Sequence, residues 1–148
     1  MSERPAGAPL EIRAVREGDV ALLQRHFARH RDESGRGEPY FMPFEVDDPD
    51  GPVGLVPEGL DLAFSVPGWH RWYLAVDPAT GEGVGHANLK GAGLRSALHR
   101  CELGLGIERA HRGQGLGRRL LEAALTLARD APEIQWVDLR VFGHNAAA

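Results

Sequence analysis

A glycine-rich turn flanked by arginines is the part of this chain whose residue types most directly indicate chemistry. The turn runs from Arg112 to Gly117 with the sequence RGQGLG, and Arg118 follows it. Glycine has no Cβ, so a ligand can approach this backbone closely. If the turn opens a helix, unpaired N–H groups and the helix dipole favour a bound anion. Arg112 and Arg118 can add charge-assisted hydrogen bonds to phosphate oxygens. The turn therefore predicts a phosphate-binding site.

The residues on either side of the turn predict a strand before it and a helix after it. Leu103, Leu105 and Ile107 alternate with other residues, which is the period of a strand. From Leu116 to Asp130 the apolar residues recur at helical spacing. The apolar segment 134–141 predicts a further, largely buried strand. A strand, a helix and a strand in this order predict a right-handed parallel crossover.

The earlier part of the chain predicts further strands and one more helix. Residues 10–15 alternate as a strand does, and Asp19 can cap a helix that ends between residues 31 and 34. Residues 71–76 and 84–89 flank a Pro/Gly turn and predict an antiparallel hairpin, and residues 98–107 form the next strand. The expected sheet is therefore mixed.

Composition limits the class of protein. The 148 residues suit a single domain spanning 1–148, and residues 1–9 are expected to be a flexible start. A net charge of −4 argues against nucleic-acid binding through a basic surface. One cysteine excludes an internal disulfide and a cysteine-based zinc site. The chain shows no membrane-length apolar run and no secretory signal, so we expect a cytoplasmic protein with no membrane partner.

The segment from 35 to 68 is rich in proline and predicts a long loop, with a short helix at 58–65. Its acidic residues Glu45, Asp47, Asp48 and Asp50 fit either a solvated surface loop, which we favour, or a loop that attracts an amine cation.

His26 and His30 stand one helical turn apart. Because no further ligands are apparent, we expect a solvated helix face rather than a metal site.

Two other phosphate-binding motifs fit the glycine turn poorly. A mononucleotide P-loop needs Lys followed by Ser or Thr after its last glycine, where this chain has Arg118. The dinucleotide fingerprint spaces its last glycine one residue further and lies near a first strand.

The pattern Arg-x-x-Gly-x-Gly between a strand and a helix resembles the signature of the GNAT superfamily of N-acetyltransferases. The resemblance covers at least residues 84–145, and the element order from Leu10 agrees with it. It implies an α/β (α+β) fold: a mixed central sheet with antiparallel early strands, a parallel crossover and helices on both faces. The usual C-terminal helix and last two strands are expected to be missing after Ala148.

The resemblance also implies acetyl-CoA as cosubstrate, with no metal. The pyrophosphate would lie on the glycine turn, and the pantetheine arm would enter a gap where the strand before the turn separates from the next parallel strand. An amide near Leu105 would stabilise the oxyanion. The implied coenzyme-binding residues are Leu105, Gly106, Ile107, Arg112, Gly113, Gln114, Gly115, Leu116, Gly117, Arg118 and Asn145.

Glu102 is the candidate catalytic base, because an attacking amine must lose a proton. Its parity on the strand matches Gly104 and Gly106, which we expect beside the arm. The equally weighted alternative is a structural glutamate paired with Arg100 or another arginine. Close packing by another element is likewise an alternative explanation of the two glycines. His86 and His99 are lesser candidates for proton transfer.

These features predict an acetyl-CoA-dependent N-acetyltransferase that acts on a primary amine of a small molecule or of a peptide or protein N-terminus. The alternative is a non-catalytic acyl-CoA-binding or interaction module, and a nucleotide-binding regulator is a weak third hypothesis. An unpaired edge on the strand at 134–141 predicts a possible homodimer.

Overall fold

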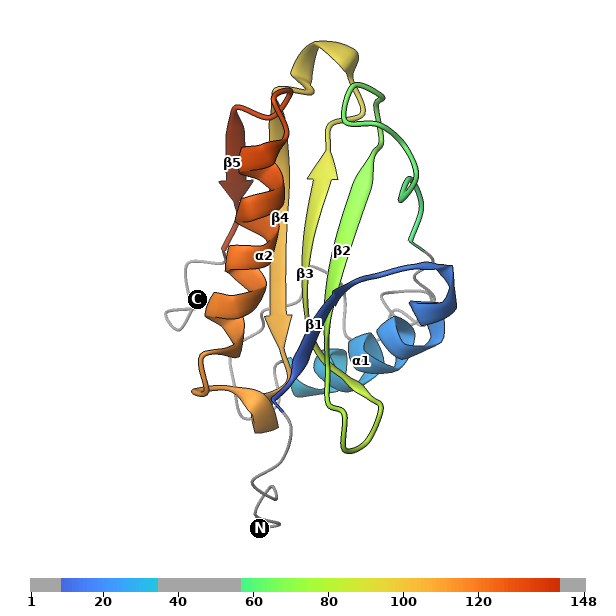
Figure 1. Ribbon diagram of the computed structural model, residues 1–148, viewed down its shortest axis with the longest axis vertical. Helices are drawn as coiled ribbons and strands as arrows, with labels where there is room; N and C mark the ends of the chain where they lie inside the picture. Colours follow the sequence, from blue (N-terminus) through green and yellow to red (C-terminus); the bar gives the residue numbers. More distant parts are fainter. Residues whose placement is uncertain (1–8, 35–56, 142–148) are drawn as a thin grey trace.

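The computed structural model describes residues 9–34 and 57–141 and shows a five-stranded sheet with helices on its two faces (Figure 1). The strand order is β1-β2-β3-β4-β5. The first four strands pair antiparallel, and β4 and β5 pair parallel. The strands are β1 (Glu11–Ala14), β2 (His70–Val76), β3 (Gly83–Gly91), β4 (Arg100–Ile107) and β5 (Trp136–Leu139). This arrangement confirms the predicted mixed sheet.

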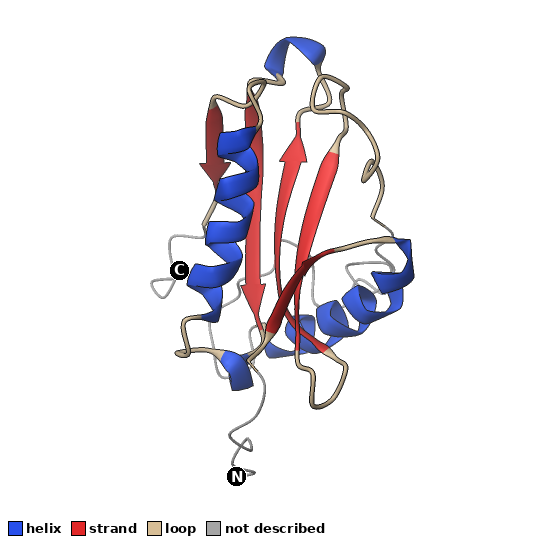
Figure 2. Ribbon diagram, viewed as in Figure 1, coloured by secondary structure: helices blue, strands red, loops and turns tan. Residues whose placement is uncertain are grey.

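Two α-helices accompany the sheet, α1 (Val20–Glu33) and α2 (Leu116–Asp130). Three short 3₁₀ helices lie in the connections: η1 (Glu17–Asp19), η3 (Arg95–Ala97) and η4 (Arg109–His111). Figure 2 shows that α2 runs along β4, whereas α1 crosses the opposite face near one end of the sheet. The two faces are therefore covered by different helices, as predicted. Within the described residues no helix is long and apolar enough to cross a membrane.

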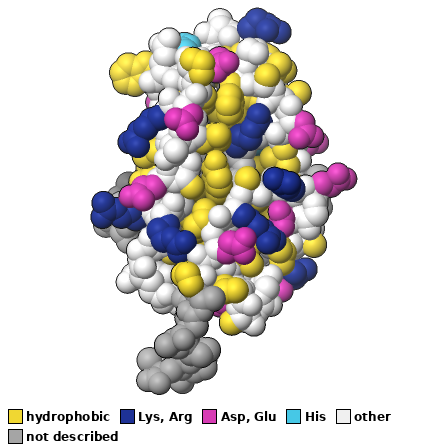
Figure 3. All heavy atoms as spheres, viewed as in Figure 1, with side chains coloured by type: hydrophobic (Ala, Val, Ile, Leu, Met, Phe, Trp, Pro, Cys, Tyr) yellow, Lys and Arg dark blue, Asp and Glu magenta, His cyan; other side chains and the backbone are white. Residues whose placement is uncertain are grey.

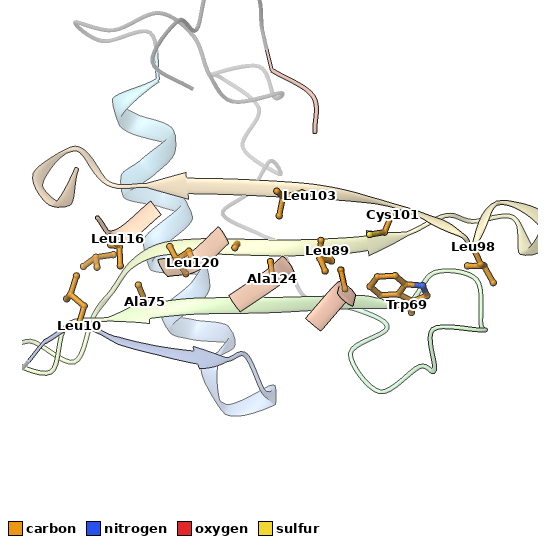
Figure 4. Packing of buried hydrophobic residues seen from close by; sticks show 13 residues of the cluster. Leu10, Trp69, Ala75, Leu89, Leu98, Cys101, Leu103, Leu116, Leu120 and Ala124 are labelled. Atoms are coloured by element: carbon orange, nitrogen blue, oxygen red, sulfur yellow. The ribbon is translucent and has the colours of Figure 1, made fainter. Parts of the chain in front are cut away.

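The larger core lies between α2 and the sheet (Figure 4). Leu116, Leu120 and Ala124 recur along one face of α2 and are buried against Leu89 and Leu103. This apolar stripe is why the segment forms a helix that packs rather than a solvated one. Because the stripe begins at Leu116, packing fixes the start of α2 against the sheet.

A smaller core lies between α1 and the opposite face, and it corrects the expectation for the histidines of α1. Leu23 and Phe27 pack with Trp72 and Leu74 of β2. The expectation that His26 and His30 form a solvated helix face is wrong, because they are 0% and 4% exposed. Both histidines face the sheet. There His26 contacts Glu108 and His86, and the ring of His30 lies near that of His86.

Several local expectations differ from the structure. The predicted short helix at 58–65 is wrong, because this segment consists of turns and bends. Asp19 precedes α1 but does not cap it; its carboxylate instead accepts hydrogen bonds from Arg13 at 2.5 Å and from the N–H of Arg16 at 3.1 Å. The last strand is shorter than the apolar segment 134–141, and the expectation that it is largely buried is wrong, because Trp136 and Leu139 are 58% and 56% exposed.

Candidate functional site

Strands β4 and β5 pair only over the first half of β4. The register runs from Arg100 opposite Trp136 to Leu103 opposite Leu139, and β4 then continues alone to Ile107. Figure 1 shows β5 ending while β4 continues toward η4. Within the described residues, one edge of Gly104–Ile107 therefore lacks a strand partner. An extended ligand can form backbone hydrogen bonds along such an edge.

The glycine turn leads from this open edge to the N-terminus of α2. Gly113 and Gly115 have φ values of 75° and 77°, a left-handed conformation that favours glycine. A Cβ on either would meet nothing within 4 Å, so the space around them is open. Gly115 immediately precedes the helix and offers no side-chain cap. The first N–H groups of α2 therefore face an open cradle suited to an anion.

Gly117 has a different role from the other two glycines. A Cβ at this position would lie 2.9 Å from Cδ1 of Ile107. Its missing side chain therefore lets the first turn of α2 pack closely against the end of β4. Leu116 beside it is buried, 2% exposed, which anchors the same turn.

The two arginines of the turn are engaged with protein groups. Nε of Arg112 donates to the carbonyl of Ile107 at 3.0 Å, and its guanidinium lies 3.7 Å from Oε2 of Glu33 on α1. Arg118 pairs with Glu122 one helical turn on, at 3.2 Å. Arg112 thus braces the turn against β4 and α1, while Gln114 lies exposed on the turn.

The glycines of β4 are explained by packing. A Cβ at Gly106 would lie 2.5 Å from Cε1 of His86 and 2.6 Å from Nε2 of His30. A Cβ at Gly104 would overlap the side-chain oxygen of Asn88. Of the two explanations that the sequence left open, close approach of other side chains therefore accounts for both positions. Leu105, on the other face, is 41% exposed.

Glu102 lies on the same face of β4 as Gly104, next to the point where β5 departs. Its side chain is 51% exposed, and Oε2 lies 3.3 Å from Nε of Arg140. The neighbouring Arg100 pairs instead with Asp138 of β5, at 2.6 Å. The arginine pairing considered from the sequence thus exists, with Arg140 as the partner. An exposed ion pair of this kind is weak, so the carboxylate stays accessible to a competing ligand.

A buried polar network at the end of β4 was not identified from the sequence. Glu108 follows β4 and accepts from Nδ1 of His26 at 2.7 Å and from Nε of Arg29 at 2.7 Å. The other ring nitrogen of His26 lies 2.9 Å from Nδ1 of His86. Burial raises the pKa of Glu108, but the hydrogen bonds from His26 and Arg29 outweigh burial and lower it overall. Burial, with His26 and His30 nearby, lowers the pKa of His86 well below its usual value.

This network attaches α1 to the segment that enters the glycine turn. Glu33, in the last turn of α1, accepts the backbone N–H of Arg109 at 2.6 Å. The same carboxylate lies 3.7 Å from the guanidinium of Arg112, so α1 contacts both ends of the connection between β4 and the turn. His26, Arg29 and Glu33 recur at helical spacing along α1, which was the one sequence signal for this network. Their partners just after β4 could not be predicted, because they lie 76 or more positions away in the sequence.

Some predicted residues lie outside the described part of the chain. These are Asn145 and the acidic residues Glu45, Asp47, Asp48 and Asp50. Among residues 9–34 and 57–141, no group of three or more His, Cys, Asp or Glu side chains is arranged to hold a metal ion. On the face seen in Figure 3, basic and acidic side chains are interspersed around apolar ones.

Comparisons with known proteins identify the family and the fold of this chain. The sequence model of the Acetyltransferase (GNAT) family matches residues 39–148. No curated protein matches the chain. An acetyltransferase of the GNAT family from Streptococcus pneumoniae superposes with a TM-score of 0.76 at 22% identity, covering 94% of this chain and 78% of that one.

Two further solved structures share the fold. A putative acetyltransferase from Salmonella typhimurium, determined with its cofactor acetyl-CoA, has a TM-score of 0.65 at 18% identity and covers 95% of this chain and 74% of its own. An aminoglycoside acetyltransferase from an uncultured soil metagenomic sample has a TM-score of 0.59 at 18% identity, covering 92% and 82%. With the family match spanning most of the sequence, the chain belongs to the GNAT family of acetyltransferases.

Proposed function

We propose that the protein is an acetyl-CoA-dependent N-acetyltransferase that acetylates a primary amine of a small molecule or of a peptide or protein N-terminus. The observation that supports this most directly is the end of β4–β5 pairing at Leu103, followed by the open edge Gly104–Ile107. That edge leads to the glycine-led N-terminus of α2. An extended arm and a pyrophosphate fit these two features in this order along the chain.

One group of residues in the site binds acetyl-CoA, and another acts in the reaction. The backbone of Leu105, Gly106 and Ile107 pairs with the arm, and the cradle from Gly113 to Arg118 binds the pyrophosphate. Gly113 and Gly115 leave open space that fits a pyrophosphate, because a Cβ at either position would meet nothing within 4 Å. Arg112 holds the cradle in place through the carbonyl of Ile107. Asn145, which lies outside the described residues, would contact the arm, as the family resemblance implies.

Acetyl-CoA supplies the activated acetyl group as a thioester, and this chain supplies the base. The amine must be neutral to attack, so a carboxylate that takes its proton lowers the barrier. Glu102 lies on the face of β4 where an amine can approach and is half exposed. A strand amide near Leu105 stabilises the charge that develops on the carbonyl oxygen.

Calorimetry with acetyl-CoA and with ATP, together with a panel of primary amines assayed by free-thiol release, tests this proposal. We expect acetyl-CoA to bind and at least one amine to release thiol. Binding of ATP without binding of acetyl-CoA would refute the proposal.

A non-catalytic acyl-CoA-binding module is the second candidate, favoured by the engagement of Glu102 with Arg140 at 3.3 Å. Under this alternative acetyl-CoA binds with similar affinity, but no amine of the panel releases thiol. The same experiment therefore separates the two functions.

A further inference from the structure

Two polar residues lie on the face of the sheet opposite α2, beyond the end that α1 covers. They are His70 at the start of β2 and Asn88 in β3. The register places Asn88 between Trp72 of β2 and Gly104 of β4. Since Gly104 is the first residue of β4 past its pairing with β5, Asn88 lies beside the point where those strands separate.

The Asn88 side chain has a defined orientation. Its Nδ2 lies 3.0 Å from Nε2 of His70. An amide nitrogen only donates, so the ring nitrogen accepts and the imidazole carries its proton on Nδ1. The amide oxygen then points the other way, into the space that a Cβ of Gly104 would fill. The absence of a side chain at Gly104 is what makes room for this oxygen.

The surroundings of His70 keep it an acceptor. Burial, together with the cations Lys90 and Arg71, lowers the pKa of His70 to about 4. The ring is therefore neutral at physiological pH, and it lies 4.8 Å from the ring of Trp72. Trp72 has a buried indole N–H with no hydrogen-bond partner in the described part of the protein. His70 therefore holds the orientation of Asn88 as a neutral hydrogen-bond acceptor.

We propose that Asn88 binds the acceptor amine through its side-chain oxygen and that His70 is the positioning residue for Asn88. This inference rests on the proposed acetyltransferase function. The amide oxygen accepts an N–H of the neutral amine and directs its lone pair toward the point where β4 and β5 separate. Asn88 takes no proton, because a neutral amide is a very weak base. Glu102 lies two residues before Gly104 on the same face and remains the proton acceptor.

The C–N bond forms as the amine attacks the thioester carbonyl, and the C–S bond breaks. The amine proton passes to Glu102, and the thiolate leaves and is protonated from solvent. The sequence did not indicate this pair, since 18 positions separate His70 from Asn88 and only the β2–β3 register joins them.

Steady-state kinetics of Asn88→Leu, His70→Leu and His70→Gln test the pair, using the amine of the panel that the wild type acetylates fastest. We expect Asn88→Leu to raise KM for the amine at least tenfold, while the calorimetric Kd for acetyl-CoA stays within about twofold. His70→Leu should raise the amine KM in the same direction. His70→Gln should restore most of it, because the glutamine oxygen can accept from Nδ2 of Asn88.

The matched control is Gln135→Leu, which replaces an exposed amide outside the site and should change neither constant. Gly104→Ala, whose Cβ displaces the Asn88 oxygen, should reproduce the Asn88→Leu effect.

An unchanged amine KM in Asn88→Leu would overturn the assignment, as would an equal loss of acetyl-CoA affinity. If the wild type fails to bind acetyl-CoA, the proposed function itself fails. If it binds acetyl-CoA but acetylates no amine, the acceptor assignment falls while coenzyme binding stands.

Discussion

The Nδ1 atom of His26 lies 2.7 Å from Oε2 of Glu108 and joins helix α1 to the end of strand β4 across 82 positions of sequence. Both residues are buried, at 0% and 7% exposed. Arg29 adds a second contact to the same carboxylate, so one acidic group receives two donors from one helix. This pairing holds the segment that enters the glycine turn, and it has measurable consequences.

The first prediction concerns the stability of this network. Glu108→Gln replaces one acceptor oxygen by a donor that faces the donors of His26 and Arg29, leaving buried groups unsatisfied. We expect the free energy of unfolding to fall by about 2 kcal/mol, measured by urea denaturation followed by circular dichroism. Glu122→Gln, which breaks the exposed pair with Arg118, is the control and should cost about 0.5 kcal/mol or less. Equal effects of the two variants would contradict the prediction.

The second prediction separates ligand binding from backbone strain at the glycine turn. Gly115→Ala should raise the Kd for acetyl-CoA at least tenfold, because its Cβ projects into the open cradle and its φ of 77° is strained for alanine. The strain should also lower the free energy of unfolding by about 1 kcal/mol.

Gly81→Ala is the matched control for that strain. Gly81 has a φ of 73° and open space around it, but it lies in the turn between β2 and β3. We expect a similar loss of stability with an unchanged Kd for acetyl-CoA. The binding role of the cradle would be wrong if Gly115→Ala and Gly81→Ala had the same acetyl-CoA affinity.

The third prediction tests Glu102 as the base. Glu102→Gln should reduce kcat by about 10² or more and leave the Kd for acetyl-CoA unchanged, because an amide cannot accept the amine proton. Asp138→Asn breaks the neighbouring exposed pair with Arg100 and should leave kcat close to the wild-type value. If Arg140→Gln lowered kcat as much as Glu102→Gln, the ion pair and not the carboxylate would be what matters.

The fourth prediction is a pH dependence of stability. The pKa of His70 is lowered to about 4 by burial, Lys90 and Arg71, and that of His86 is lowered by burial and by His26 and His30. An unfolded histidine binds a proton below about pH 6.5, whereas these two in the folded protein do not. The unfolded state therefore binds more protons between about pH 4 and 6.5, and stability must rise with pH across this window.

Urea unfolding at pH 5 and pH 7 measures this slope. The wild type should be less stable at pH 5, and His70→Gln should show a smaller difference between the two pH values because one of the two groups is removed. The lowered pKa of Glu108 adds a further loss only at lower pH, when that carboxylate protonates. A His70→Gln slope equal to the wild-type slope would show that His70 does not contribute.

The residues that could be predicted from sequence are those whose information is local. The stripe Leu116, Leu120 and Ala124 defined α2, and its bounds agree with the predicted ones. The glycine turn could be recognised because backbone conformation there depends on the missing Cβ itself. The prediction of a helix at 58–65 is wrong. The backbone groups of this segment are paired through turns instead, such as the hydrogen bond from the N–H of Leu62 to the carbonyl of Gly59.

The candidate site was predictable only in part. Glu102 and Gly104 were placed on one face by strand parity alone, and the structure agrees. The arginine that pairs with Glu102 could not be predicted, because Arg100 on β4 and Arg140 just after β5 both lie nearby. The pairing of Arg100 with Asp138 leaves Arg140 as the partner of Glu102. The prediction of a solvated His26 is wrong because a polar residue on a helix is expected to face water unless its buried partners are known.

By itself, the sequence determined the mixed α/β fold, the strand–turn–helix unit and the anion-ready N-terminus of α2. These follow from apolar periodicity and from glycine, and both act over a few neighbouring residues. The tertiary structure alone decided where β5 leaves β4, which side chains fill the space over Gly104 and Gly106, and how His26 meets Glu108. Those relationships depend on strand register and helix packing, which bring together residues far apart in the chain. A register shift of one residue would have turned Asn88 and Glu102 to the other face of the sheet.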